Sequence, residues 1–147
     1  MITTYLDTSA LAKWYLNEEF SEEFEVFVQS LPSAVISSLT ELEFRCLLAR
    51  RRRYGELTPN LEPQIYDCFR RDIARGHLRL LPLQDHHLEV ALGLIDRLSG
   101  NALRTLDALH LALAQDSGTQ MLATADRAMA KAAEALGLNV ERFFSEA

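Results

Sequence analysis

Four acidic residues far apart in the sequence stand at positions from which they could share one site. Each follows an expected strand or lies in the first turns of an expected helix: Asp7, Glu43, Asp107 and Asp126. Asp7 follows the run I-T-T-Y-L, and Asp126 follows M-L-A-T-A. In open α/β sheets, ligands bind beyond the carboxyl ends of the strands, so acids placed there could converge on one pocket.

Converging carboxylates suggest a particular chemistry. They repel one another, and at neutral pH they are tolerated only if cations neutralise them or some keep their protons. A ligand set of oxygen atoms without histidine or thiolate suits hard cations such as Mg²⁺ or Mn²⁺. These ions bind phosphate oxygens and activate water, so the expected reaction is hydrolysis of a phosphate ester.

Asp107 is the most unusual of these acids. It stands in L-R-T-L-D-A-L-H-L-A-L-A-Q, which is apolar on almost every side of a helix. Such a helix is expected to be buried, and a buried carboxylate is costly unless something pairs with it. Asp107 could alternatively lie in the first turn of a helix capped by Thr105, where the helix dipole favours an acid.

The other acids also have purely structural interpretations. Asp7 and Asp126 could each cap the helix that follows. Glu43 could be one more charge on a helix that also carries Glu41. Because the chain contains 21 acidic residues, many sets of four would show comparable spacing, and spacing alone does not decide.

Alternating strand and helix patterns predict the frame that positions these acids. Short β-branched or apolar runs predict strands at 2–6, 34–37, 78–82, 121–125 and 138–142. Apolar spacing, caps and breakers predict helices at 10–16, 21–31, 40–54, 58–75, 85–98, 103–115 and 127–136. This alternation predicts a three-layer α/β/α fold around a mainly parallel sheet of four to five strands, in a single domain over residues 1–147.

The sequence also predicts where two of these helices begin and which residues share a face of a third. Thr40 is expected to cap the third helix, and Thr58-Pro59 to begin the fourth. In the fifth helix, five apolar residues are expected on one face: Leu88, Ala91, Leu92, Ile95 and Leu98.

Composition narrows the class of protein. The 147 residues are 48% hydrophobic and 24% charged, as in an ordinary globular domain. There is no apolar run of about 20 residues and no basic, apolar leader, so a cytoplasmic protein is expected. The net charge of −6 argues against non-specific binding to nucleic acid, but an acidic metal site in a nuclease would contribute to it.

The cysteines and the paired histidines do not suggest a second site. Cys46 and Cys68 form no C-x-x-C pair and are expected to be small, buried or half-buried side chains. His86 and His87 are adjacent, so on a helix they diverge by about 100°, and a shared metal ion is not expected.

Four segments together resemble the successive motifs of the PIN domain. In chain order they are L-D-T-S-A-L-A-K-W-Y-L, S-S-L-T-E-L-E-F-R-C-L-L-A-R, L-R-T-L-D-A-L-H-L-A-L-A and L-A-T-A-D-R-A-M-A-K-A-A-E-A-L-G-L. More narrowly, they resemble the VapC-type ribonuclease toxins of type II toxin–antitoxin systems, over nearly the whole chain. One departure is E-E-F-S-E-E at 18–23, where relatives often carry Gly or Pro, and it is expected to affect surface contacts only.

The resemblance implies an enzyme that uses Mg²⁺ or Mn²⁺ to cut single-stranded RNA. It places metal ligands at Asp7, Asp107 and Asp126, while Glu43 completes the shell or positions the attacking water. Glu41 is the alternative if the register is shifted by two. The implied partners are RNA, a VapB-type antitoxin whose C-terminal segment covers the acidic pocket, and a second copy of the chain in a homodimer.

Five further residues near these motifs have open roles. Ser9 and Thr124 could bind a substrate phosphate or hold a carboxylate, or be simply a helix cap and a strand residue. Arg50 and Arg53 could guide the RNA backbone, or be solvated cations favourable to the end of a helix. His110, three residues after Asp107, is expected to make a structural hydrogen bond rather than to act in catalysis.

Two rival functions remain. A phosphatase or receiver-like domain would phosphorylate an aspartate, but the D-x-D signature fails because Thr8 and Ser9 follow Asp7. A catalytically silent PIN-fold protein that binds RNA or serves as a scaffold is the second alternative, and the complete set of four acids weighs against it.

Overall fold

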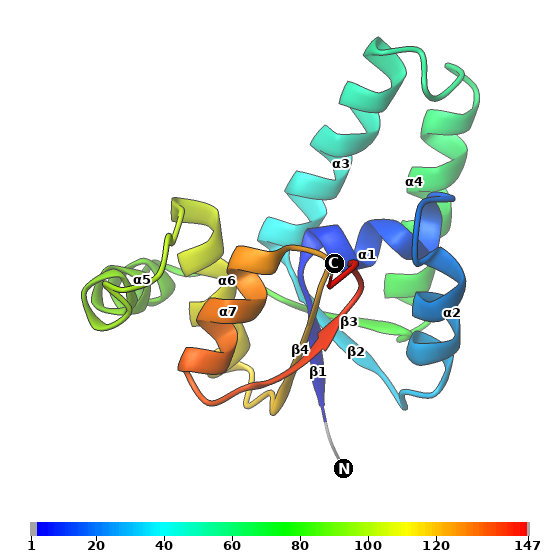
Figure 1. The fold of residues 1–147 in the computed structure, drawn as a ribbon. Coiled ribbons are helices and arrows are strands. Elements are labelled where there is room, and N and C mark those ends of the chain that lie inside the picture. The colour runs from blue at the N-terminus through cyan, green and yellow to red at the C-terminus, as the bar shows by residue number, and fades with distance from the viewer. Residues whose placement is uncertain (1–2, 147) are drawn as a thin grey trace.

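The computed structural model describes residues 3–146 and contains one parallel sheet (Figure 1). The strand order is β3-β2-β1-β4-β5, and every neighbouring pair is parallel. The strands are β1 (Thr4–Leu6), β2 (Ala34–Ser37), β3 (Leu78–Leu81), β4 (Met121–Thr124) and β5 (Asn139–Arg142). The expected α/β/α fold is confirmed, with five strands. Residue 2, where the first strand was expected to begin, lies outside the described residues.

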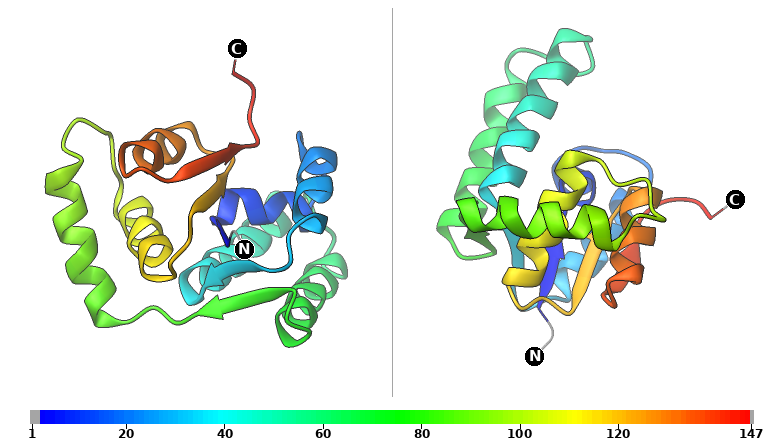
Figure 2. Two further views of the ribbon diagram at one scale, coloured as in Figure 1. Left: turned by 90° about the horizontal axis from the view of Figure 1, so that it is seen from below. Right: turned by 90° about the vertical axis from the view of Figure 1, so that its left-hand side faces the viewer.

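Seven helices cover the two faces of this sheet (Figures 1 and 2). One face carries α1 (Thr8–Tyr15), α2 (Ser21–Gln29), α3 (Ser38–Arg53) and α4 (Leu61–Ala74). The other carries α5 (Asp85–Arg97), α6 (Thr105–Asp116) and α7 (Arg127–Ala135). Among residues 3–146, no helix combines the length and apolar character that crossing a bilayer requires.

The core lies in two apolar layers, one on each face of the sheet. Successive strand residues point to opposite faces, so neighbouring residues of one strand enter different layers. Tyr5 packs with the layer under α5, α6 and α7, whereas Leu6 packs with the layer under α1 to α4. Val35 and Ile36 divide in the same way.

Helix α6 is buried along most of its length, as its sequence predicts. All residues from Asp107 to Ala114 are buried, because the sheet lies on one side of the helix and α5 on the other. Figure 2 shows α5 crossing the outer side of α6. The carboxylate of Asp107 therefore needs partners that offset the cost of its burial.

Two helices begin at residues other than those expected. Ser37, not Thr40, caps α3: the Ser37 hydroxyl accepts from the Thr40 N–H, and the Thr40 hydroxyl accepts from the Ser37 N–H, both at 3.2 Å. This reciprocal pair is a capping box, which places Thr40 inside the helix. Helix α4 begins at Leu61, because Thr58 closes a turn by accepting from the Leu61 N–H at 3.1 Å.

Of the five apolar residues expected on one face of α5, only Ala91 and Leu98 are buried. Leu88, Leu92 and Ile95 are 48%, 68% and 44% exposed. The buried stripe is instead His87, Ala91, Leu94 and Leu98. The two sets share Ala91 and Leu98, and the buried one includes a histidine, which an apolar pattern does not include.

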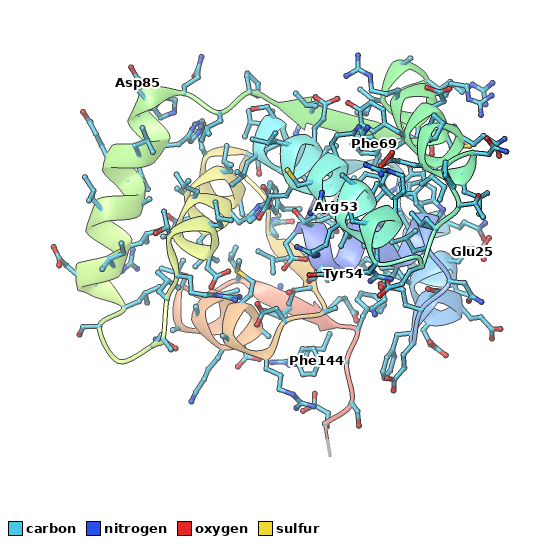
Figure 3. The ribbon with its side chains drawn as sticks, turned by 90° about the horizontal axis from the view of Figure 1, so that it is seen from above. Glu25, Arg53, Tyr54, Phe69, Asp85 and Phe144 are labelled. Carbon is cyan, nitrogen blue, oxygen red and sulfur yellow. The ribbon has the colours of Figure 1, made fainter. Side chains whose placement is uncertain are left out.

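Helices α3 and α4 extend beyond the sheet as a projecting hairpin (Figure 1). Figure 3 looks down on this end and shows Arg53 and Tyr54 at the far end of α3. Cys46 on α3 and Cys68 on α4 are both exposed, so the expectation that they are buried or half-buried is wrong. Cys46 is open to solvent because it lines the cavity described below, and Cys68 lies on the exposed side of α4.

Candidate active site

The four acids predicted from the sequence line one cavity of about 720 Å³ at the carboxyl edge of the sheet: Asp7, Glu43, Asp107 and Asp126. Glu41 does not line this cavity. Its carboxylate accepts a hydrogen bond from Tyr66 at 3.2 Å and pairs with Arg70 on α4. Of the two registers considered for the α3 acid, the structure therefore places Glu43 at the cavity.

Strand pairing brings Asp7 and Asp126 to the same edge. Leu6 of β1 is in register with Ala123 of β4, so the residues that follow these strands leave the sheet side by side. Asp7 caps α1 by accepting from the Ala10 N–H at 2.9 Å, and Asp126 caps α7 by accepting from Ala128 at 2.9 Å. Both acids therefore cap a helix and also line the cavity.

Asp7 is a buried carboxylate held by neutral donors. Ser9 donates its hydroxyl to Oδ1 at 2.7 Å, and Thr124 donates to Oδ2 at 2.5 Å. Burial raises the pKa of Asp7, and nearby His110 and these hydrogen bonds oppose that rise. Through these hydrogen bonds both residues hold a carboxylate, which was one of the two roles considered for each. Ser9 lines the cavity, and Thr124 is fully buried.

Asp107 and Asp126 share a cation from their own chain, Arg104. Its Nε donates to Asp107 Oδ2 at 3.0 Å, and its Nη2 donates to Asp126 Oδ2 at 2.6 Å. Hydrogen bonds to Asp107 and the charges of both acids raise the pKa of Arg104, so the guanidinium is charged. Arg104 also precedes α6 as its N-cap, so the expected Thr105 cap is wrong.

Arg104 is a site residue that the sequence motifs did not single out. A signal existed, since Arg104 precedes Asp107 by three residues, the spacing at which side chains meet on a helix. The contact with Asp126, 22 residues further along the chain, could not be inferred from that spacing.

Glu43 lies in the second turn of α3 and is held on two sides. Thr8 donates its hydroxyl to Oε1 at 2.6 Å, and His110 Nε2 lies 2.5 Å from the same oxygen. Burial alone would raise the pKa of Glu43, but the hydrogen bonds from His110 and Thr8 and the charge of Arg104 bring it below its ordinary value. Glu43 is therefore ionised near neutral pH.

The site geometry agrees with comparisons to known proteins. The PIN domain matches residues 4–135 of the chain. The chain belongs to the PIN-domain family. Ribonuclease VapC46 of Mycobacterium tuberculosis is 35% identical to it over 143 residues, which cover 95% of this chain and 97% of the relative. The resemblance inferred from the four motifs is confirmed.

Solved structures share the fold of this PIN domain. Mycobacterium tuberculosis VapC20, described as a toxin that cleaves the sarcin–ricin loop, aligns with a TM-score of 0.69 at 18% identity, covering 88% of this chain and 94% of that one. VapBC2 from Rickettsia felis, bound to a DNA fragment from its promoter, aligns with a TM-score of 0.68 at 14% identity, covering 97% and 99%. At such identities the similarity supports the fold alone.

The arginines at the end of α3, Arg50 to Arg53, do not all lie at the cavity. Arg50 and Arg51 line the cavity, but Arg51 donates to Glu18 at 2.6 Å. Arg53 lies outside the cavity lining, at the far end of α3 (Figure 3). Glu18 itself lines the cavity and also pairs with Lys13 at 3.5 Å, so the expectation that the 18–23 segment affects surface contacts only is wrong.

Away from this cavity, two histidines of the PIN domain meet one carboxylate. His86 and His87 do not diverge as expected: their ring centroids are 4.0 Å apart, and both Nε2 atoms approach Asp116 Oδ2, at 3.2 and 2.7 Å. The three ligand atoms lie close enough to hold a metal ion.

The hydrogen bonds of His87 nevertheless argue against a metal there. The Gln84 N–H donates to His87 Nδ1 at 2.9 Å, so the proton of the neutral ring is on Nε2 and is donated to Asp116. A metal ligand needs that nitrogen unprotonated. The cluster instead ties the start of α5 to the end of α6.

Proposed function

We propose that this PIN domain is a metal-dependent endoribonuclease that hydrolyses phosphodiester bonds of single-stranded RNA and acts as the toxin of a toxin–antitoxin pair. The observation that carries the proposal is the convergence of four acids, from four separate segments, on one cavity. The 35% identity to a VapC ribonuclease over almost the whole chain supports the same function.

Asp7, Asp107 and Asp126 would hold Mg²⁺ or Mn²⁺. Carboxylate oxygens are the ligands that these hard ions prefer. Asp7 fits such an ion because it is a buried carboxylate whose pKa burial raises, and a cation beside it would relieve the cost of its charge. When bound, the ion would supply an activated water and neutralise charge on the phosphate.

The chain's own residues would prepare the attack on phosphorus. Ionised Glu43 can accept a proton from the attacking water, and Thr8 and His110 fix the direction in which its carboxylate points. Ser9 and Thr124 hold Asp7 in one orientation. We assign Arg50 the role of contacting an RNA phosphate, because it lines the cavity and, among residues 3–146, no carboxylate is seen paired with it.

The proposed partners follow from the relatives. A structure from Klebsiella pneumoniae that shares the fold is described as a toxin–antitoxin complex, and we propose a VapB-type antitoxin that covers the acidic cavity of this chain. The family resemblance also supports a homodimer and a cytoplasmic location. The proposed substrate is RNA. Because the protein carries a net charge of −6, we propose that RNA phosphates bind through the metal ion held by the acids rather than through the overall charge of the protein.

Expression in a bacterial host distinguishes the toxin from the silent scaffold. The toxin should arrest growth, and Asp7→Asn should relieve the arrest at equal protein level. A matched control is Asp67→Asn, since Asp67 lies on the exposed side of α4 away from the cavity. Arrest by Asp7→Asn equal to that by the wild type would favour the scaffold.

A further inference from the structure

Arg104 occupies two of the three carboxylates that the proposed function assigns to a metal ion. Its guanidinium spans Asp107 and Asp126, and its backbone N–H also donates to Asp107 Oδ2 at 3.3 Å. No hydrogen bond joins it to Asp7, which keeps neutral donors. Arg104 therefore neutralises part of the negative charge of the acids that would bind the metal ion.

The exposed position of the Arg104 side chain allows it to rotate away from the two carboxylates. It is 70% exposed, whereas the side chains of Asp107 and Asp126 are 9% and 28% exposed. Within the described residues, the hydrogen bonds of its guanidinium go to these two acids. Its backbone remains fixed as the N-cap of α6, so departure requires rotation of one side chain only.

Charge and exposure favour its replacement by a divalent ion. Ion pairs of an exposed guanidinium are weakened by water and salt. A divalent ion brings twice the charge and can approach the carboxylates more closely than a guanidinium does. Both cations need the same oxygen atoms, so they compete rather than bind together.

We propose that Arg104 is a built-in counter-cation of the metal-free pocket, which a divalent ion must displace and which thereby sets the metal affinity of the site. This inference rests on the proposed metal-dependent function. It adds a competitor for the carboxylates that belongs to the chain itself, and it explains how the acids are tolerated together before a metal binds.

Isothermal titration with Mn²⁺ on the full chain tests the inference without RNA. Arg104→Gln should bind Mn²⁺ roughly three- to tenfold more tightly than the wild type, because the competitor is gone. Arg104→Lys keeps a charge but cannot span two carboxylates with a planar fork, so its affinity should lie between the two. Arg50→Gln is the matched control, since Arg50 lines the same cavity but is not seen bonded to the acids.

Thermal unfolding supplies a second readout. Arg104→Gln should lower the Tm of the protein in EDTA but leave the Tm in saturating Mn²⁺ close to that of the wild type, where the guanidinium is already displaced. A purely structural role would lower both values equally and would overturn the inference.

The titration also distinguishes the proposed role of Arg104 from the proposed metal site. Suppose that Mn²⁺ binding depends on Asp7 but that Arg104→Gln leaves the affinity unchanged or weakens it. The proposed role of Arg104 as a counter-cation is then wrong, and the metal site is still supported. Equal tightening by Arg50→Gln overturns the role of Arg104 too, because it would show a general charge effect. Absence of Asp7-dependent binding in both the wild type and Arg104→Gln overturns the metal site and the inference together.

Discussion

His110 joins Glu43 at the cavity to Tyr5 in the sheet. Its Nε2 lies 2.5 Å from Glu43 Oε1, and its Nδ1 lies 2.7 Å from the Tyr5 hydroxyl. Burial raises the pKa of Tyr5, so the phenol keeps its proton at neutral pH and bonds to both His110 Nδ1 and the Ser37 hydroxyl. Because Glu43 is ionised and can only accept, the His110 Nε2–H is the donor to Glu43. The structural hydrogen bond predicted for His110 is present, and the residue that it orients, Glu43, is the proposed proton acceptor.

Replacing His110 should affect both cleavage and stability. His110→Ala leaves Glu43 without its orienting donor, so single-turnover RNA cleavage should fall by about 10- to 100-fold, as for other residues that orient ligands in metal sites. It also leaves the buried Tyr5 hydroxyl with one partner fewer, which should cost about 1–3 kcal/mol in urea unfolding. Tyr5→Phe on its own should slow cleavage less, because Thr8 still holds Glu43. An unchanged cleavage rate in folded His110→Ala would contradict the positioning role.

The two neighbouring acids of α3 should behave differently. Glu43→Gln removes a proposed proton acceptor and should slow cleavage by about 10²- to 10⁴-fold. Glu41→Gln is its matched control, because Glu41 is bonded to Tyr66 and Arg70 outside the cavity. Rates measured on one RNA at saturating Mn²⁺ decide the matter, and a larger loss for Glu41→Gln would refute the assigned register.

Asp7 should destabilise the metal-free protein at neutral pH. Its pKa is raised in the folded chain, so the folded state binds more protons than the unfolded state above the ordinary pKa of 3.8. Stability attributable to this group therefore falls as pH rises through that window. In EDTA, Asp7→Asn should be more stable than the wild type at pH 7, and the difference should shrink as the pH falls towards 4.

Urea unfolding of both proteins between pH 4 and 7.5 measures that difference. Glu43 contributes with the opposite sign, because its pKa is lowered, but it is present in both proteins and cancels. A gap between wild type and Asp7→Asn that does not change with pH would contradict the raised pKa.

Arg50 and Arg53 should differ in their contribution to RNA binding. With EDTA present to prevent cleavage, Arg50→Gln should weaken binding of a single-stranded oligonucleotide and reduce the slope of log K against log salt by about 0.7, the value for one phosphate contact. Arg53→Gln should change both less, since Arg53 does not line the cavity. Fluorescence anisotropy across a salt series measures the binding constant of each variant. Equal losses for Arg50→Gln and Arg53→Gln would contradict a specific contact from Arg50 and would indicate that the arginines at the end of α3 attract RNA by their combined charge.

Much of the frame could be predicted from local patterns. The order and type of the elements follow from apolar periodicity and caps, and the convergence of Asp7 and Asp126 follows from parallel strands that share an edge. The burial of α6 followed from a helix that is apolar all round.

Features that depend on distant neighbours could not be predicted. The role of Arg104 depends on Asp126, which only the packing of α6 beside α7 brings within reach. The buried side of α5 begins with His87, and its bond to Asp116, which lies 29 residues away in sequence at the end of α6, could not be inferred from the apolar spacing. Glu18 reaches the cavity because Lys13 and Arg51 hold it there.

Cleavage of a panel of tRNA and rRNA fragments tests the central claim most directly. The wild type is compared with Asp107→Asn in Mn²⁺, in EDTA, and in EDTA followed by excess Mn²⁺, with circular dichroism to show that both proteins are folded. The wild type should cut in Mn²⁺, stop in EDTA and cut again when excess Mn²⁺ is added, whereas Asp107→Asn should cut little or not at all. Cutting that persists in EDTA, or equal cutting by Asp107→Asn, would contradict a metal-dependent nuclease built on these acids.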